Sequence, residues 1–189
     1  MRDKESSKEK ILSTALKLFL SKPYSKVSVD EIARKSGFSK GAVFHYFKSK
    51  LEIAENVLQI LVAKIVALPL KRIIYSDKSF REKIYDIIGL ALNFSLKHDL
   101  KTIVFLAGLY YELKACGREF FLGMAYDSLQ QVVYEFFKEN NVSNPKVKAL
   151  IFTAILDGLS VQCMIASEVF RNNDFVLKIK EEIYNFVRC

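Results

Sequence analysis

Apolar residues recur at three- and four-residue steps along nearly the whole chain, and this spacing constrains the fold more than any other feature. The first run, from about Ser7 to Leu20, places Ile11, Ala15 and Phe19 on one helical face. The 189 residues include only 7 Gly and 3 Pro, too few for an all-β fold with a turn every 8–12 residues. We therefore predict an all-α protein of about nine helices.

Recognisable start and stop residues bound these helices. Ser28, Ser49 and Ser79 each stand three residues before a Glu, which predicts capping boxes. Pro69 is expected to end the helix that starts near Ser49. Asn144 is expected to cap the long apolar helix that starts at Pro145. The predicted helices cover residues 7–20, 29–35, 39–47, 49–68, 80–97, 100–114, 118–138, 145–169 and 173–187.

The positive charge is concentrated at one end of the chain. The net charge is +8, and residues 1–50 contain 12 Lys/Arg against 5 Asp/Glu. Residues 51–189 contain 17 and 16, so they are close to neutral. This asymmetry predicts a polyanion-binding head followed by a near-neutral body.

The remaining bulk features point to a cytoplasmic protein without metal or cofactor. The three cysteines and two histidines are not spaced as metal ligands, and the charged start Met1–Glu5 does not resemble a signal peptide. The apolar stretch Ala149–Ser167 is long enough to span a membrane, but Asp157 at its centre would cost about 2.5–3.5 kcal/mol on insertion. We expect a helix buried on both faces in a soluble protein instead.

Residues 28–47, SVDEIARKSGFSKGAVFHYF, have the pattern of a helix-turn-helix. Ala33 is small enough for two helices to approach, Gly37 permits the positive φ of a tight turn, and Val43 packs the second helix on the first. Phe47 is expected to complete this small core. The pattern gains weight because it lies in the basic head.

The wider stretch from Lys8 to Ile53, KEKILSTALKLFLSKPYSKVSVDEIARKSGFSKGAVFHYFKSKLEI, resembles the N-terminal domain of the TetR family of transcriptional regulators. The resemblance covers about the first 55 residues; beyond them it is one of helical layout. It implies a three-helix DNA-binding domain at 1–50 and a helical effector-binding and dimerisation domain at 51–189. The implied function is a dimeric regulator, expected to be a repressor, that binds a pseudo-palindromic DNA operator and is released by a small apolar effector.

Motif positions shared with that family suggest which residues meet DNA. The second helix of the motif would enter the major groove, roughly 12 Å wide. Asp30 stands where several family members carry a basic residue, and we assign it to the helix dipole. Phe44 is left open between core packing and DNA contact. The expected base-reading residues are Lys40, Gly41, Ala42 and His45, and those expected at sugar and phosphate are Phe44, Tyr46, Lys48, Lys50, Ser28 and Ser39.

The body is expected to supply an effector site and a dimer interface. An acyl-chain compound is our first expectation for the effector, and a lipophilic drug-like molecule the second. The expected effector contacts are Phe94, Phe105, Phe121, Met124, Phe152 and Asp157, although core packing is the default for such aromatic residues. Asp157 is left open between orienting a ligand and satisfying helix ends at a subunit contact. The expected dimer contacts form one small-residue stripe, namely Ile151, Ala154, Gly158, Val161 and Ile165.

Two other classes of function were weighed. An all-α lipid- or isoprenoid-binding enzyme or carrier would fit the apolar helices. The adjacent carboxylates, Asp30-Glu31 and Glu181-Glu182, are explained as helix-terminal or surface residues, and the sequence has neither a metal-binding acidic cluster nor a Gly-rich phosphate loop. A basic lipid-surface protein would carry its cations along one amphipathic face, whereas here they surround the helix-turn-helix. We therefore predict that the chain is not an enzyme.

Overall fold

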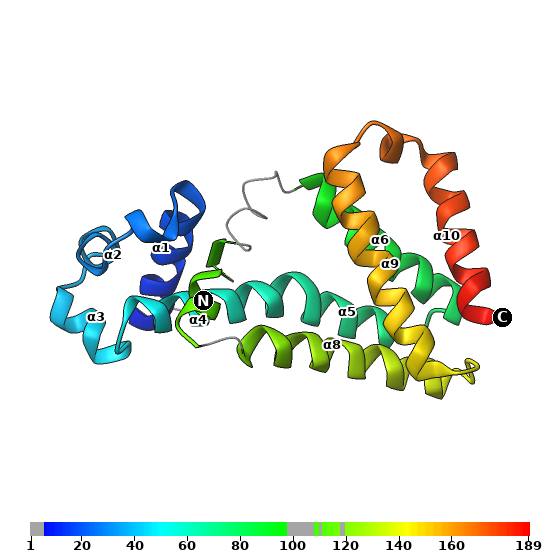
Figure 1. Ribbon diagram of the computed structural model, residues 1–189, viewed down its shortest axis with the longest axis horizontal. Helices are drawn as coiled ribbons and strands as arrows, with labels where there is room; N and C mark the ends of the chain where they lie inside the picture. Colours follow the sequence, from blue (N-terminus) through cyan, green and yellow to red (C-terminus); the bar gives the residue numbers. More distant parts are fainter. Residues whose placement is uncertain (1–5, 98–107, 110, 118–119) are drawn as a thin grey trace. The chain divides into compact units, whose positions relative to one another are not determined.

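The fold, seen in a computed structural model, is helical wherever regular structure is described (Figure 1). The structure describes residues 6–97, 108–109, 111–117 and 120–189. No β-strand occurs in these ranges, which confirms the all-α prediction. The α-helices are α1 (Ser7–Ser21), α2 (Val29–Ser36), α3 (Lys40–Tyr46), α4 (Lys50–Val62), α5 (Leu68–Ile74), α6 (Phe80–Lys97), α8 (Phe120–Glu139), α9 (Pro145–Ile165) and α10 (Asn173–Arg188).

The chain divides into two compact units. The first lies within Met1–Ala63 and Lys101–Leu122, and the second within Lys64–Leu100 and Gly123–Cys189. The N-terminal stretch of the first unit thus continues to the end of α4, whereas the sequence analysis placed a domain boundary after residue 50. A second stretch, far along the chain, also belongs to the first unit.

The first unit is built around one apolar core. Helix α1 contributes Ile11, Ala15 and Phe19, all with at most 2% of their surface exposed. Helix α4 adds Ile53 and Val57 to the same core. These positions follow the helical period read from the sequence, so local amphipathic patterning accounts for most of this core.

Two further core residues of the first unit come from the segment 108–117. Its residues 108–109 and 111–115 are helical, and Leu109 and Leu113 are buried in the same cluster as Ile11 and Ile53. The DNA-binding head predicted from residues 1–50 is therefore completed by residues some 60 positions further along the chain.

Side-chain caps fix where the helices of the first unit begin. Ser6 and Glu9 form a full capping box at the start of α1, which the sequence analysis did not predict. Ser28 and Ser49 accept from the amides of Glu31 and Glu52, each at 3.1 Å, which is half of the predicted capping boxes. The glutamates bind elsewhere, Glu31 to Lys22 and Glu52 to the Lys48 amide.

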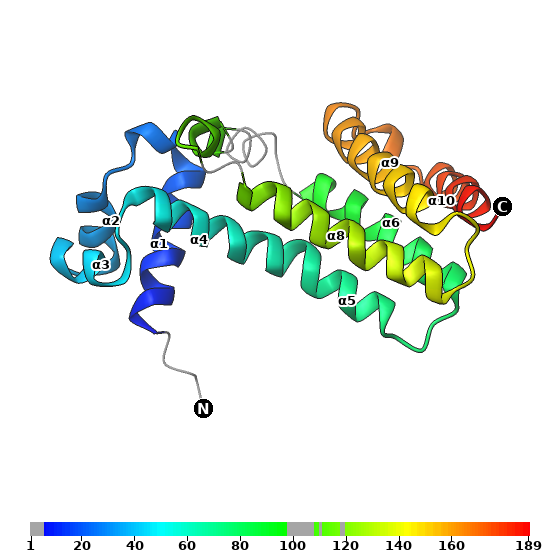
Figure 2. The same ribbon diagram turned by 60° about the horizontal axis from the view of Figure 1, so that its bottom comes forward.

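The second unit is organised around α6. Helices α9 and α10 pack against α6, as Figure 2 shows, and α5 contacts it as well. Ile84 and Ile88 of α6 are fully buried among Phe137 of α8 and Phe152 of α9, whose ring centroids lie 5.4 Å apart. Aromatic packing therefore fills the centre of this unit.

One predicted helix boundary is wrong. The helical backbone does not end at Pro69, because five π-helical residues, Ala63–Ala67, lead into α5 and Pro69 lies in its first turn. A proline is tolerated there since the amide it lacks would have no intrahelical partner. The predicted start of α9 is confirmed, since Asn144 is its N-cap and Pro145 its first residue; Asn144 is in a left-handed conformation, φ 48°, and its side chain makes no capping bond.

Helix α9 is covered on one face only. Its inner residues Ala149, Phe152 and Cys163 are buried, whereas Val147 and Ile165 on the outer face are 59% and 75% exposed. We expected α9 to be buried on both faces, and within one copy of the chain this expectation is wrong. Among the described helices, α9 alone is long and apolar enough to cross a membrane on length and composition.

Candidate nucleic-acid interface

The helix-turn-helix has the geometry that the sequence predicts. Helix α2 ends at Gly37, whose φ of 78° is the left-handed conformation that glycine adopts without strain. The Phe38 amide then donates to the Ala33 carbonyl at 2.9 Å and closes the turn. Val43 is fully buried and Phe47 is 1% exposed, so both core predictions are confirmed.

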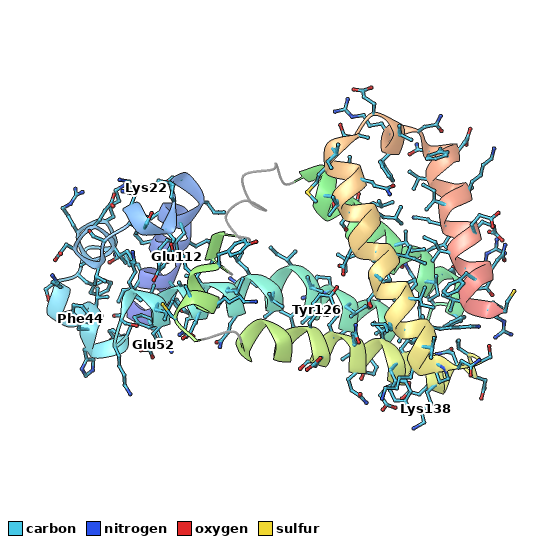
Figure 3. The ribbon with its side chains drawn as sticks, viewed as in Figure 1. Lys22, Phe44, Glu52, Glu112, Tyr126 and Lys138 are labelled. Atoms are coloured by element: carbon cyan, nitrogen blue, oxygen red, sulfur yellow. The ribbon has the colours of Figure 1, made fainter. Side chains whose placement is uncertain are left out.

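The opposite face of α3 is open to solvent. Lys40, Gly41 and His45 are exposed, and Phe44 and Tyr46 are 44% and 40% exposed. Figure 3 labels Phe44 on the outer side of α3. The open question about Phe44 is thus answered by the structure, because a core residue at this position would be covered as Val43 and Phe47 are.

The remaining residues expected at DNA flank this face. Ala42 is half-buried, and Lys48 is exposed with no acidic partner among the residues that the structure describes. Ser39 caps α3 by accepting from the Ala42 amide at 3.1 Å. Ser28 caps α2 in the same way, and each hydroxyl keeps its hydrogen for donation to an oxygen outside the protein.

The ammonium of Lys50 is bonded within the protein, whereas the sequence analysis expected it to meet phosphate. Its ammonium donates to the carbonyls of Tyr24 and Val27, both at 3.0 Å, and lies 4.0 Å from the centroid of the Tyr24 ring. Burial lowers the pKa of Lys50, and the carboxylate of Glu112 partly offsets this effect. Lys50 therefore holds the segment before α2 in place.

An ion pair joins the first turns of α2 and α3. Lys40 Nζ lies 2.9 Å from Asp30 Oδ2, and both side chains are more than half exposed. Asp30 was assigned to the dipole of α2 alone, and the structure adds the lysine to which it binds. The neighbouring acid, Glu31, instead binds Lys22 at 2.5 Å and Lys35 at 3.5 Å.

Two cations near this surface were missed by the sequence reasoning. Lys8 Nζ lies 5.6 Å from the ring centroid of Phe47, and Lys10 Nζ lies 5.7 Å from that of Phe38. Both aromatic residues flank α3, so the first turn of α1 brings positive charge beside it. The charge run around Lys8 was visible in the sequence, but its position relative to α3 depends on tertiary packing.

The residues expected to bind an effector are not brought together where the structure describes them. Phe152 is fully buried against Phe137, whereas Asp157 is exposed on α9. Loss of hydration raises the pKa of the Asp157 carboxyl. Phe152 is thus a core residue, in agreement with the default interpretation. Phe105 and the side chains of Phe94, Phe121 and Met124 lie outside the described residues.

The residues expected at a dimer interface share the open face of α9. Ile151, Val161 and Ile165 are 39%, 51% and 75% exposed. Ala154 and Gly158 between them are exposed as well, and a Cβ atom at Gly158 would have no neighbour within 4 Å. These five residues form a continuous uncovered stripe.

Known transcriptional regulators resemble this chain over part or most of its length. SrpR of Pseudomonas putida, an HTH-type transcriptional regulator, is 39% identical over 54 residues, which make up 29% of this chain and 25% of SrpR. The match thus spans only a quarter of that relative. YwcC of Bacillus subtilis (strain 168), an uncharacterized HTH-type transcriptional regulator, is 25% identical over 87% of this chain and 79% of its own length.

The fold of the whole chain also has solved counterparts. NalD of Pseudomonas aeruginosa, the secondary repressor of the MexAB-OprM multidrug efflux pump, superposes with a TM-score of 0.68 and 21% identity, covering 97% of each chain. SrpR and YwcC are named as transcriptional regulators, which agrees with the prediction that the chain is not an enzyme.

The family itself follows from the N-terminal helices. Residues 11–57, which span most of α1 and all of α2 and α3, match the family model described as "Bacterial regulatory proteins, tetR family". The same residues contain the turn at Gly37 and the exposed face of α3. The N-terminal part of this chain, residues 11–57, is therefore similar to the DNA-binding part of the TetR family of bacterial regulatory proteins.

Proposed function

We propose that the protein is a transcriptional regulator, acting as a repressor, that inserts α3 into the major groove of operator DNA. The observation that carries this proposal is the division of α3 into a buried and an open face. Val43 and Phe47 anchor the helix, while Lys40, Gly41 and His45 remain exposed. A short helix anchored in this way can present its open face to base edges.

The surrounding chemistry supports DNA as the ligand. Phosphate contacts come mainly from Lys and Arg side chains, hydroxyls and aromatic hydroxyls. Lys48, Tyr46, Ser28 and Ser39 supply such groups next to α3, and all four are exposed. Lys8 adds a further cation near Phe47. We assign Lys40, Gly41, Ala42 and His45 to the bases, and Phe44 to the sugars.

A binding experiment tests this proposal. The full chain is titrated into labelled DNA selected from a random pool and into scrambled DNA, at several salt concentrations. We expect selective binding whose affinity falls steeply with salt, because each neutralised phosphate contributes about 0.9 to the slope of log K against log[salt]. Lys48→Ala should reduce the slope, whereas Lys146→Ala, at an exposed position of α9, serves as the control. Equal, salt-insensitive binding of both DNAs would contradict the proposal.

A dimer follows from the same hypothesis. Two α3 helices related by a two-fold axis would read a pseudo-palindromic operator with half-sites about 34–36 Å apart. The uncovered stripe Ile151, Ala154, Gly158, Val161 and Ile165 supports α9 as the interface, because an exposed apolar face of this length favours a partner. Sedimentation of the full chain measures the assembly directly.

We further propose that a small apolar effector releases the protein from DNA. The support is the aromatic composition of the second unit, and Phe94 of α6 and Met124 of α8 stay our candidates for contact. A long acyl compound and a lipophilic drug-like compound are titrated into the protein alone and into its DNA complex. An effector must bind the free protein more tightly than the complex, by the same factor by which it weakens DNA binding. Equal affinity for both would contradict this role for that compound.

A further inference from the structure

Asp30 is an exposed acidic residue in the first turn of α2. It is the second residue of α2, and its carboxylate is directed to Lys40, the first residue of α3. We propose that Asp30 and Lys40 act as one recognition unit that selects a G·C base pair in each half-site. This inference rests on the proposed function and names the sequence feature that the same surface recognises.

The stability of the fold does not explain this ion pair. Its two side chains are 55% and 64% exposed, and exposed pairs of this kind contribute little to stability because water screens them. The other ion pairs of α2 differ, since Glu31 is only 18% exposed and joins α1 to α2 through Lys22. The Asp30–Lys40 pair lies instead beside the open face of α3.

Both partners are committed to each other in the free protein. Among the residues that the structure describes, Lys40 Nζ pairs with Asp30 and no other cation pairs with Asp30. The remaining acids nearby are engaged elsewhere: Glu31 binds Lys22 and Lys35, and Glu52 accepts from the Lys48 amide. The pair therefore presents a donor and an acceptor side by side.

This arrangement discriminates between the backbone and the bases of DNA. Phosphate oxygens are anionic and only accept hydrogen bonds, so the Asp30 carboxylate opposes any contact that Lys40 makes with them. In the major groove a G·C pair offers guanine O6 and N7 as acceptors and the cytosine N4 amino group as a donor. Lys40 can donate to guanine while Asp30 accepts from cytosine, so both charges are satisfied without separating the pair.

The inference is tested by selection from DNA with a randomised half-site, using the wild type, D30A, K40A and the double variant. We expect the wild type to enrich G·C at one position. Each single variant should lose that preference by a factor of about 5 to 150, the effect of one base-specific contact, and the double variant should lose no more. Asp77→Ala, at an exposed loop position, removes one negative charge as the matched control and should keep the preference.

The possible outcomes separate this inference from the proposed function. If the wild type enriches a sequence and D30A enriches the same one, Asp30 does not read DNA. If D30A changes affinity for selected and scrambled DNA by the same factor, Asp30 acts only as a repelling charge, and the inference is again overturned. Enrichment of A·T at the position lost in K40A would contradict the G·C assignment.

If the wild type enriches nothing, the proposed function itself fails. Unchanged thermal unfolding of D30A and K40A shows that the variants remain folded.

Discussion

The ammonium of Lys50 lies over the ring of Tyr24, 4.0 Å from its centroid, and donates to the carbonyl of the same residue. This contact ties the start of α4 to the short 3₁₀ turn Tyr24–Lys26 before α2. Burial of the Tyr24 phenol, together with the nearby charges of Glu112, Cys116 and Glu55, raises its pKa to about 12. The cation that the sequence suggests for phosphate is thus used to assemble the head.

Replacing Lys50 by Met should therefore lower the free energy of unfolding more than it lowers the affinity for DNA. The variant keeps the aliphatic stem but leaves the carbonyls of Tyr24 and Val27 without their donor, and we expect a loss of about 1–3 kcal/mol. Denaturant unfolding measures the change. Lys48→Met is the control, because its exposed side chain should change stability by no more than about 0.5 kcal/mol while weakening DNA binding. A fully stable Lys50→Met protein with a reduced salt slope would restore Lys50 to the phosphate contacts.

Leu113 should be as important to the head as residues of α1. It is 1% exposed within the core cluster of the first unit, so Leu113→Ala is expected to cost about 2–5 kcal/mol. Ala115→Ser, at an exposed position of the same segment, should be nearly neutral. Hydrogen exchange of α1 and α4 amides locates the effect. Loss of protection restricted to α6 or α9 would show that Leu113 does not support the head.

Acid should weaken the contact between α1 and α2. The hydrogen bond from Lys22 holds the pKa of Glu31 below its ordinary value of 4.5, with Lys35 adding to the effect. A lowered carboxyl pKa stabilises the fold above the unfolded pKa, and this contribution is lost as the pH falls through the folded pKa. Glu31→Gln should therefore lower the unfolding temperature at pH 7 and lower it less at pH 3. An equal effect at both pH values would show that the charge of Glu31 is not responsible.

Substitutions on the open face of α9 test dimerisation without disturbing the fold of the monomer. A side chain at Gly158 meets nothing within 4 Å, and Leu in place of Gly favours the helix by roughly 1 kcal/mol. We expect Gly158→Leu and Ile165→Glu to give folded monomers that no longer bind operator DNA. Gly158→Ala is the control, since it should remain dimeric. A dimer that survives both changes in sedimentation would place the interface elsewhere.

The sequence by itself determined the local structure of this protein. Apolar spacing indicated α1 to α3, the cap at Ser28 indicated where α2 begins, and Gly37, Val43 and Phe47 have the roles that their residue types predict. These features depend on hydrogen bonds and contacts within a few residues, which the local sequence specifies. The small number of glycines and prolines likewise indicated an all-α fold.

Tertiary structure decided which distant side chains meet. Leu113 enters the core of the head, Lys50 binds Tyr24, and Lys40 binds Asp30, although nothing in the local pattern pairs these residues. A flexible cation such as Lys50 can reach solvent, a carbonyl or a phosphate equally well from its own helix, and only the packing of neighbouring helices selects one of them. The open face of α9 has the same cause, because helical periodicity shows that a face is apolar but not whether another helix covers it.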